Sequence, residues 1–375
     1  MTDIQGTCTD RFSSVQQAFA ANFDAGLEVG ASVCVVVDGK TEVDLWAGHA
    51  GVERTRPWGS DTITNVWSST KTQMYLVCLM LADRGELDLH APVAKYWPEF
   101  AANGKGGVEV RHFLSHSSGL PGWDEPLEQS DLWDHDKCAA SLARQAPWWE
   151  PGTASGYHAI SQGYLIGEVV RRVAGQSLGT FFRKEVAEPL GADFHIGTGP
   201  EHDARIVPII PPAAALPPGL DPTGIPIRVF GNPPMDPAMA LTTEWRRCES
   251  PAANGQGNAR SLASTQSIVS HGGEVGGRRF LSEATCRRVF EPQTSGVDMV
   301  LGLPITFGMG YALPSPDLPV GGPGSCFWGG WGGSLVVNDL DHRMTVAYVM
   351  NRMGNGTVGD ERGGGLLMAA YAALA

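Results

Sequence analysis

The hydrophobic residues near the start of this chain follow one helical and two strand-like patterns. Residues 11–23 place apolar side chains at helical spacing. Residues 31–37 and 41–47 are runs rich in valine and other strand-forming residues. Asp38-Gly39 lies between these runs and is typical of a tight hairpin turn. The pattern therefore predicts a helix followed by a β-hairpin.

The middle of the chain is predicted to be mostly helical. The longest apolar stretch, residues 74–82, has nine residues, too few to span a bilayer, and predicts a buried helix that ends at Gly85. Ten prolines within residues 205–237 exclude a regular helix or a central strand and predict a long loop that lines a site or covers a face. Further helices are predicted at 110–115, 136–145, 158–174, 178–188, 259–271 and 282–290.

After about residue 302 the pattern returns to strands. Strands are predicted at 305–312, 333–338 and 343–350, followed by a helix at 364–374. Strands at both ends around a helical middle predict an α/β (α+β) fold with an antiparallel sheet built from both chain ends and flanked by helices. We expect a sheet domain of residues 1–90 and 295–375. A mostly helical domain of residues 91–294 would contain the proline-rich loop at 205–237.

Composition and charge narrow the possible partners. Hydrophobic residues make up 42% of the chain and charged residues 18%, which is typical of a globular protein. There are 27 Lys and Arg against 40 Asp and Glu, a formal net charge of −13. Nucleic acids and anionic membrane surfaces require clustered positive charge, so neither is predicted as a partner.

Cysteine usage and the first residues indicate the compartment. The seven cysteines are an odd number, widely spread, with neither a C-x-x-C pair nor metal-ligand spacing. Residues 1–10 are polar and have no positively charged segment before an apolar block, so no signal peptide is predicted. Both observations predict a cytoplasmic protein with reduced thiols and no metal.

One motif carries chemistry by its spacing. Ser68 and Lys71 form S-x-x-K where strand-like sequence passes into a helix, and this spacing puts both side chains on one helix face. A serine hydroxyl needs an adjacent base to act as a nucleophile, and a lysine with a lowered pKa can be that base. The helix start also offers free N–H groups that can stabilise an oxyanion.

Further motifs follow in order and at suitable spacing. They are Leu114-Ser115-His116-Ser117-Ser118-Gly119-Leu120-Pro121, Tyr157-His158-Ala159, Gly257-Asn258-Ala259-Arg260 and Trp328-Gly329-Gly330-Trp331-Gly332-Gly333-Ser334. With the S-x-x-K motif, this set resembles the serine β-lactamase and penicillin-binding-protein superfamily. It is most similar to the class C-like branch and, within it, to the family VIII carboxylesterases. The resemblance covers about residues 12–374 and implies a β-lactamase/DD-peptidase-like fold.

The resemblance also implies roles for individual residues. Ser68 is expected to be the acyl-accepting nucleophile, Lys71 its base partner and Tyr157 the catalytic tyrosine. A nearby Lys71 cation would favour the Tyr157 phenolate, and which of the two is the main base stays open. The backbone N–H groups of Ser68 and Trp331 would form the oxyanion hole, and Gly329 and Gly330 would let the substrate approach the strand closely.

Two departures from the β-lactamase pattern bear on the substrate. Trp328 stands where β-lactamases and peptidases carry the lysine of a Lys-Thr-Gly-like element, so a cation is replaced by an indole. Ala159 stands where lactamases have an asparagine that binds a substrate amide. Because charge-assisted hydrogen bonds are about twice as strong as neutral ones, these changes favour neutral esters.

Other candidate residues are assigned by their surroundings. Trp123 and Trp328 lie beside the motifs and are predicted to line an apolar acyl pocket, and His158 is predicted to offer it a polar contact. His112 and His116 are four residues apart but lack the glutamate of a zinc-protease helix, so no metal site is predicted. Gly-Gln-Ser-Leu-Gly at residues 175–179 matches G-x-S-x-G, yet it follows a helical pattern instead of the strand that a nucleophile elbow requires.

Together the residues predict a serine carboxylesterase. It would hydrolyse neutral, short-to-medium-chain esters through an acyl-enzyme on Ser68, with a small-molecule ester as its partner and without a cofactor. Three alternatives stay open: a β-lactamase, D-aminopeptidase-like or other amide hydrolase; an acyltransferase; and a catalytically silent binding protein. The oligomeric state is not predicted.

Overall fold

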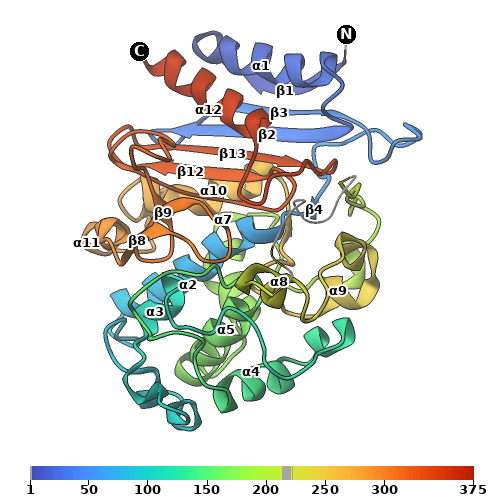
Figure 1. The fold of residues 1–375 in the computed structure, drawn as a ribbon. Helices are drawn as coiled ribbons and strands as arrows, with labels where there is room; N and C mark the ends of the chain where they lie inside the picture. Colours follow the sequence, from blue (N-terminus) through green and yellow to red (C-terminus); the bar gives the residue numbers. More distant parts are fainter. Residues whose placement is uncertain (1, 213–220, 222) are drawn as a thin grey trace.

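A large antiparallel sheet forms the upper part of the molecule (Figure 1). The structure is a computed structural model that describes residues 2–212, 221 and 223–375. Among these residues, nine strands form the sheet in the order β1-β3-β2-β13-β12-β11-β10-β9-β8, and each neighbouring pair is antiparallel. In chain order they are β1 (Ile4–Cys8), β2 (Gly30–Val37), β3 (Lys40–Gly48), β8 (Thr294–Val297), β9 (Pro304–Phe307), β10 (Ala312–Leu313), β11 (Ser325–Gly329), β12 (Leu335–Asp339) and β13 (Met344–Met350).

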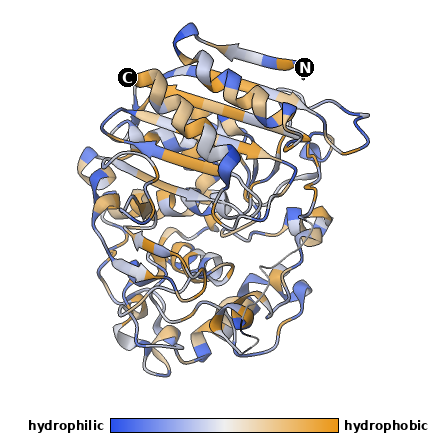
Figure 2. Ribbon diagram, turned by 45° about the horizontal axis from the view of Figure 1, so that its top comes forward, coloured by the Kyte–Doolittle hydropathy of each residue, from blue (hydrophilic) through white to orange (hydrophobic). Residues whose placement is uncertain are grey.

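Strands from the two ends of the chain pair within this sheet. β2 pairs with β13, with Ala31 opposite Met350 and Val37 opposite Met344. Every residue of both strands is buried, as their apolar sequences require. Figure 2 shows the hydrophobic residues following the strands of the sheet. The predicted fold class, an antiparallel sheet built from both chain ends and flanked by helices, is confirmed.

Helices cover both faces of the sheet. α1 (Ser13–Asp24) and α12 (Glu361–Leu374) lie side by side on the outer face (Figure 1). On the other face, α10 (Ala259–Ser270) packs against β2, β12 and β13. The predicted division of the chain at residues 90 and 294 stays a prediction, and α10, which it assigns to the helical part, contacts the sheet directly.

The predicted hairpin is confirmed as β2 and β3. Val37 pairs with Lys40, so the connection is the two residues Asp38 and Gly39. Their φ angles are +49° and +74°, the left-handed conformation that a type I′ turn requires at both central positions.

Other parts of the sheet differ from prediction. β1 was not predicted, and the strand predicted at 305–312 is divided into β9 and β10. The division occurs at Gly310, where a Cβ atom would lie 2.5 Å from the Cγ of Tyr75 and where φ is +100°. The backbone therefore leaves the strand where it packs against an aromatic ring. The predicted strands at 333–338 and 343–350 are confirmed as β12 and β13.

The lower part of the molecule is mainly helical and is centred on α2 (Lys71–Asp83), which is buried from Lys71 to Leu81. The helix predicted at 178–188 is interrupted by a π-helical turn at Arg183–Ala187. No helix within the described ranges is long and apolar enough to cross a bilayer. The remaining helices outside the proline-rich stretch are α3 (Val110–Leu114), α4 (His135–Arg144), α5 (Ser161–Ala174), α6 (Leu178–Phe182), α7 (Glu188–Leu190), α9 (Thr243–Arg247) and α11 (Glu283–Arg287).

The proline-rich stretch, residues 205–237, contains a short helix. The prediction that this stretch excludes a regular helix is wrong for α8 (Ile225–Phe230). Pro226 lies in the first turn of α8, where a missing N–H costs no hydrogen bond. Residues 213–220 and 222 of the predicted loop lie outside the described residues.

Candidate active site

Ser68 lies on a tight turn between a short strand and α2. The strand β4 (Thr64–Asn65) pairs with β5 (Gln256–Gly257) and ends just before this turn. Trp67, the residue before Ser68, has a φ of +48°, a left-handed conformation that is strained for a bulky side chain. The hydroxyl of Ser334, the last residue of the turn between β11 and β12, donates to the Val66 carbonyl at 2.8 Å. The turn between β11 and β12 thus holds the Ser68 turn in place.

Lys71 points from the first turn of α2 toward Ser68. Its Nζ lies 2.6 Å from the Ala159 carbonyl oxygen, 2.9 Å from that of Ala252 and 3.4 Å from the Ser68 Oγ. The side chain is fully buried, and within the described residues it has no carboxylate partner. Burial therefore lowers the pKa of Lys71 well below its usual value.

Tyr157 also contacts Ser68. Its hydroxyl donates to the Ser68 Oγ at 2.6 Å, and its ring centroid is 4.9 Å from the Lys71 Nζ. Burial raises the pKa of Tyr157 well above its usual value. The expected Lys71 cation beside a Tyr157 phenolate is therefore not what this environment favours. Because burial penalises both charges, it favours a neutral amine and a neutral phenol.

The backbone N–H groups of Ser68 and Trp331 are the predicted oxyanion-hole donors. Within the described residues, neither the Ser68 N–H nor the Trp331 N–H donates to another group of the protein. Gly330 brings the two segments together, because a Cβ there would lie 2.3 Å from the Val66 carbonyl oxygen and 3.3 Å from the Ser68 nitrogen. Only glycine allows this approach.

A mainly apolar cavity of about 100 Å³ opens in front of the Ser68 hydroxyl. Its polar members are Ser68, Tyr157 and Thr357, and none of its members carries a charge. Its walls include the turn before α2, the proline-rich stretch, the loop after β8 and the turn after β11. The remaining lining residues are Trp67, Ala159, Ile160, Pro226, Phe230, Met235, Ala253, Val300, Leu301 and Trp331.

The sequence matches the family profile described as Beta-lactamase over residues 19–369. The chain belongs to the Beta-lactamase family. The resemblance carried by the motifs around Ser68, Tyr157 and Trp328 is thereby confirmed.

Similar members of the Beta-lactamase family include esterases. The Esterase/beta-lactamase LipL of Mycobacterium tuberculosis is 34% identical over 363 residues, which cover 93% of this chain and 83% of LipL. A crystal structure of a family VIII carboxylesterase is 40% identical, with a TM-score of 0.93 over 99% of this chain and all of that one. A penicillin-binding protein homolog from Caulobacter crescentus is 37% identical, with a TM-score of 0.93 over 99% of this chain and 100% of that one.

Some predicted site residues of this Beta-lactamase family member lie away from the cavity. Trp328 is fully buried behind Tyr157, with ring centroids 5.3 Å apart, and Gly329 also lies outside the lining. The Trp123 indole donates to the Cys138 carbonyl at 3.1 Å. His158 is held between the Ser118 hydroxyl at 2.7 Å and the Gly156 carbonyl at 2.6 Å. Because Trp123 and His158 face the protein interior, we do not retain them as substrate contacts.

Other residues around the cavity were not predicted. Phe230 and Met235 come from the proline-rich stretch, which thus lines the site, one of the two roles left open for it. Val300 and Leu301 come from the loop after β8, and the Ala252 carbonyl is a partner of Lys71. None belongs to a motif, and a backbone carbonyl leaves no signal in a sequence.

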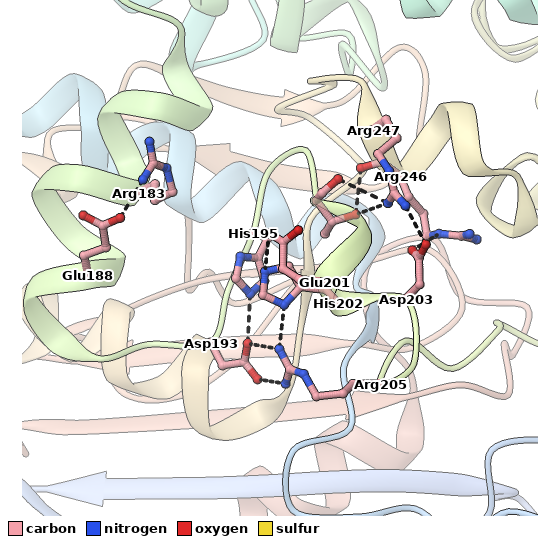
Figure 3. A network of polar contacts seen from close by, with 11 residues as sticks. Arg183, Glu188, Asp193, His195, Glu201, His202, Asp203, Arg205, Arg246 and Arg247 are labelled. Carbon is pink, nitrogen blue, oxygen red and sulfur yellow. Dashed lines mark hydrogen bonds and ion pairs between the residues drawn. The ribbon is translucent and has the colours of Figure 1, made fainter.

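Within the described residues, the one cluster with metal-ligand spacing is Asp193, His195 and His202, whose ligand atoms lie within 4.8 Å of one another (Figure 3). The Arg205 guanidinium donates to both Asp193 oxygens, at 2.5 and 2.9 Å, and approaches the His202 Nδ1 at 2.8 Å. The same guanidinium donates to the Asp61 carbonyl at 2.8 Å. The Asp193 carboxylate is thus already paired with the Arg205 cation. Through Arg205, the cluster is also joined to the segment before β4.

Proposed function

We propose that this protein is a serine carboxylesterase that hydrolyses neutral esters through an acyl-enzyme on Ser68. The observation that carries the proposal is the environment of the Ser68 Oγ. It accepts a hydrogen bond from Tyr157 at 2.6 Å, lies 3.4 Å from a buried amine and faces an apolar cavity. A nucleophile in contact with both a base and a proton donor is the arrangement that acyl transfer requires.

Lys71 is the base in this proposal. A neutral amine has two N–H groups and one lone pair. The Ala159 and Ala252 carbonyls accept the two N–H groups, which leaves the lone pair for the Ser68 hydroxyl. Lys71 takes the hydroxyl proton while the Ser68 oxygen bonds to the ester carbonyl carbon.

Other groups stabilise the oxyanion and protonate the leaving group. The Ser68 and Trp331 N–H groups, which have no partner within the described residues, donate to the carbonyl oxygen as it becomes negative. When the C–O bond breaks, Tyr157 gives its proton to the leaving alkoxide and recovers one from the Lys71 ammonium. Water then attacks the acyl-enzyme, Lys71 again accepts the proton, and the carboxylic acid leaves as Ser68 regains its hydrogen.

The lining of the cavity supports neutral substrates. No charged side chain lies within it, so a substrate carboxylate would lose hydration without gaining an ion pair. The space of about 100 Å³, closed by Phe230, Met235 and Leu301, supports short-to-medium acyl chains. A small-molecule ester is thus the proposed partner.

Similarity and thiol chemistry give further support. A family VIII carboxylesterase and an Esterase/beta-lactamase are both similar over most of the chain. Because the second protein is also named a β-lactamase, the proposal includes weak β-lactam cleavage as a side activity. The cavity, however, lacks a cation that could bind a β-lactam carboxylate. All seven cysteines are unpaired, which supports a reducing, cytoplasmic location.

The test is a paired measurement of kcat/KM for p-nitrophenyl butyrate and a chromogenic cephalosporin, with Ser68→Ala as the blank. We expect the ester to be preferred by several orders of magnitude and the variant to be inactive. Preference for the cephalosporin would replace the esterase with an amide hydrolase. Full ester activity in the variant would remove Ser68 from the mechanism.

A further inference from the structure

Asp298 lies in the loop between β8 and β9, and its carboxylate is fully buried. One of its oxygens, Oδ1, accepts three backbone N–H groups. They belong to Tyr157 at 3.0 Å, Val300 at 2.9 Å and Leu301 at 2.9 Å. The first residue is the proposed proton donor, and the other two form a wall of the cavity. A single oxygen therefore joins the chemical centre to the acyl-binding surface.

The surroundings of Asp298 are unusual for a buried carboxylate. Within the described residues it forms no ion pair, and its second oxygen, Oδ2, is buried without a hydrogen-bond partner. Burying an unpaired carboxylate is costly, and folding alone rarely favours it. The three N–H groups offset part of this cost at Oδ1, since hydrogen bonds to an ionised acceptor are stronger than neutral ones.

A second contact ties the same two segments together. The Met299 N–H donates to the Ser155 carbonyl at 3.0 Å, two residues before Tyr157. The segment before α5 and the loop after β8 are therefore fixed to each other at both of these points. A change at Asp298 would move the Tyr157 backbone and the Val300–Leu301 wall together.

We propose that Asp298 is the positioning residue of this site, holding Tyr157 over Ser68 and the Val300–Leu301 wall at a fixed distance from it. The inference rests on the proposed function, because it assigns Tyr157 a part in ester cleavage. Asp298 touches no substrate and acts through the groups that it holds. A displacement of about 1 Å at such a centre can lower a rate about 100-fold.

The test is a double-mutant cycle with Asp298→Ala and Tyr157→Phe, read as kcat for p-nitrophenyl butyrate. In the wild-type background, Asp298→Ala is expected to lower kcat about 10- to 100-fold. In the Tyr157→Phe background, where the hydroxyl is already missing, it should cost less than about threefold. Equal losses in the two backgrounds would overturn the proposal, since residues that act independently give additive effects.

Controls separate positioning from stability. Asp298→Asn keeps an oxygen for the three N–H groups and should retain more activity than Asp298→Ala. Asp339→Ala removes another buried carboxylate, at the end of β12 and away from the cavity. It should lower the melting temperature while changing kcat by no more than about twofold. If Asp298→Ala does not fold, the same cycle is run with Asp298→Val, which also removes the acceptor oxygen, and equal losses again overturn the proposal.

The Val300–Leu301 wall provides a second readout, the preference for acyl-chain length. The ratio of kcat/KM for the butyrate ester to kcat/KM for the octanoate ester should move closer to 1 in Asp298→Ala, even when Tyr157 is replaced by Phe. An unchanged ratio would contradict the link to Val300 and Leu301. Labelling of Ser68 by a fluorophosphonate tests the proposed function separately. A wild-type protein that neither reacts with the probe nor cleaves the ester refutes the esterase, whereas a reactive protein with an additive cycle refutes only the positioning role.

Discussion

At the scale of single residues, opposite pKa shifts divide the roles around Ser68. Burial lowers the pKa of Lys71 and raises the pKa of Tyr157, so it favours the neutral form of both groups. A neutral amine can accept the Ser68 proton and a neutral phenol can donate one. Two side chains beside the Ser68 hydroxyl are thus suited to act as a base and an acid.

This division predicts how activity depends on pH and on Lys71. As the pH falls through the lowered pKa of Lys71, the amine becomes protonated, so kcat/KM should decrease toward low pH. Lys71→Arg, which keeps a permanent cation, should lose about 1000-fold or more of kcat/KM at every pH. The matched control is Lys105→Arg, since Lys105 is also buried and also donates to backbone carbonyls, away from the cavity. Substantial activity in Lys71→Arg would exclude Lys71 as the base.

The proposed oxyanion hole predicts that a glycine matters more than its aromatic neighbour. In Gly330→Ala the added Cβ would lie 2.3 Å from the Val66 carbonyl oxygen, so the turn must shift and kcat should fall about 100-fold or more. Trp331→Ala keeps the backbone N–H and should keep more than about a tenth of kcat. The control is Gly364→Ala in α12, where no atom lies within 4 Å of the added Cβ. A greater loss in Trp331→Ala than in Gly330→Ala would assign the role to the indole.

At the scale of elements, α8 acts as part of the cavity wall. Arg228 on this helix stacks on Trp148, 3.7 Å from the ring centroid, and pairs with Asp124 at 2.9 Å. The Trp148 indole donates to the same carboxylate at 2.9 Å. These contacts hold α8 against the segments before and after α4, and Phe230 lines the cavity.

Shortening the α8 side chain that faces the cavity should enlarge the acyl pocket. Phe230→Ala is expected to move the preferred acyl chain to greater length and to raise kcat/KM for octanoate relative to butyrate esters. A p-nitrophenyl ester series measures this shift. Phe290→Ala, at a partly buried position outside the cavity, is the control. An identical chain-length profile for Phe230→Ala and wild type would place the acyl group elsewhere.

The elements also show what a sequence can reveal. The β2–β3 hairpin, β12, β13 and the helix after Ser68 have local signals in turn residues and periodicity, and they were predicted. The short strand β1 and helix α8 depend on partners far along the chain, so local patterns missed them. Ser68 and Lys71 could be paired by spacing alone, and Tyr157 was assigned by resemblance. The roles of Asp298 and of the cavity wall could not be predicted from the sequence, because these residues meet Tyr157 only after the chain folds.

At the scale of the whole molecule, a buried charged cluster joins the two ends of the chain. Glu28, just before β2, pairs with Arg362 of α12 at 3.1 Å and accepts a hydrogen bond from Tyr348. Arg362 also pairs with Asp360 at 2.6 Å and donates to the Gly332 carbonyl at 2.6 Å, next to the proposed oxyanion turn. The Arg362 cation thus pairs with two carboxylates, those of Glu28 and Asp360. Burial raises the pKa of Glu28 to about 7.

This cluster predicts how stability depends on pH. The folded state holds a proton on Glu28 more tightly than the unfolded chain, whose glutamate has a pKa near 4.5. The resulting stabilisation, about 3 kcal/mol at most, is present below pH 4.5 and is lost as the pH rises through 7. Glu28→Gln should therefore make the melting temperature less dependent on pH between 5 and 8. The comparison is thermal unfolding at several pH values, and parallel curves for the two proteins would exclude Glu28 as the titrating group.

The pairing of β2 with β13 has a consequence for synthesis on the ribosome. The partner of β2 lies about 300 residues further along the chain. At about 5–20 residues per second, the ribosome needs about 15–60 s to make that partner. During this interval the valine-rich β2 has an open edge, the kind of surface that pairs with other chains. Until β13 is made, the nascent chain thus exposes a surface for pairing with other chains that the finished sheet covers.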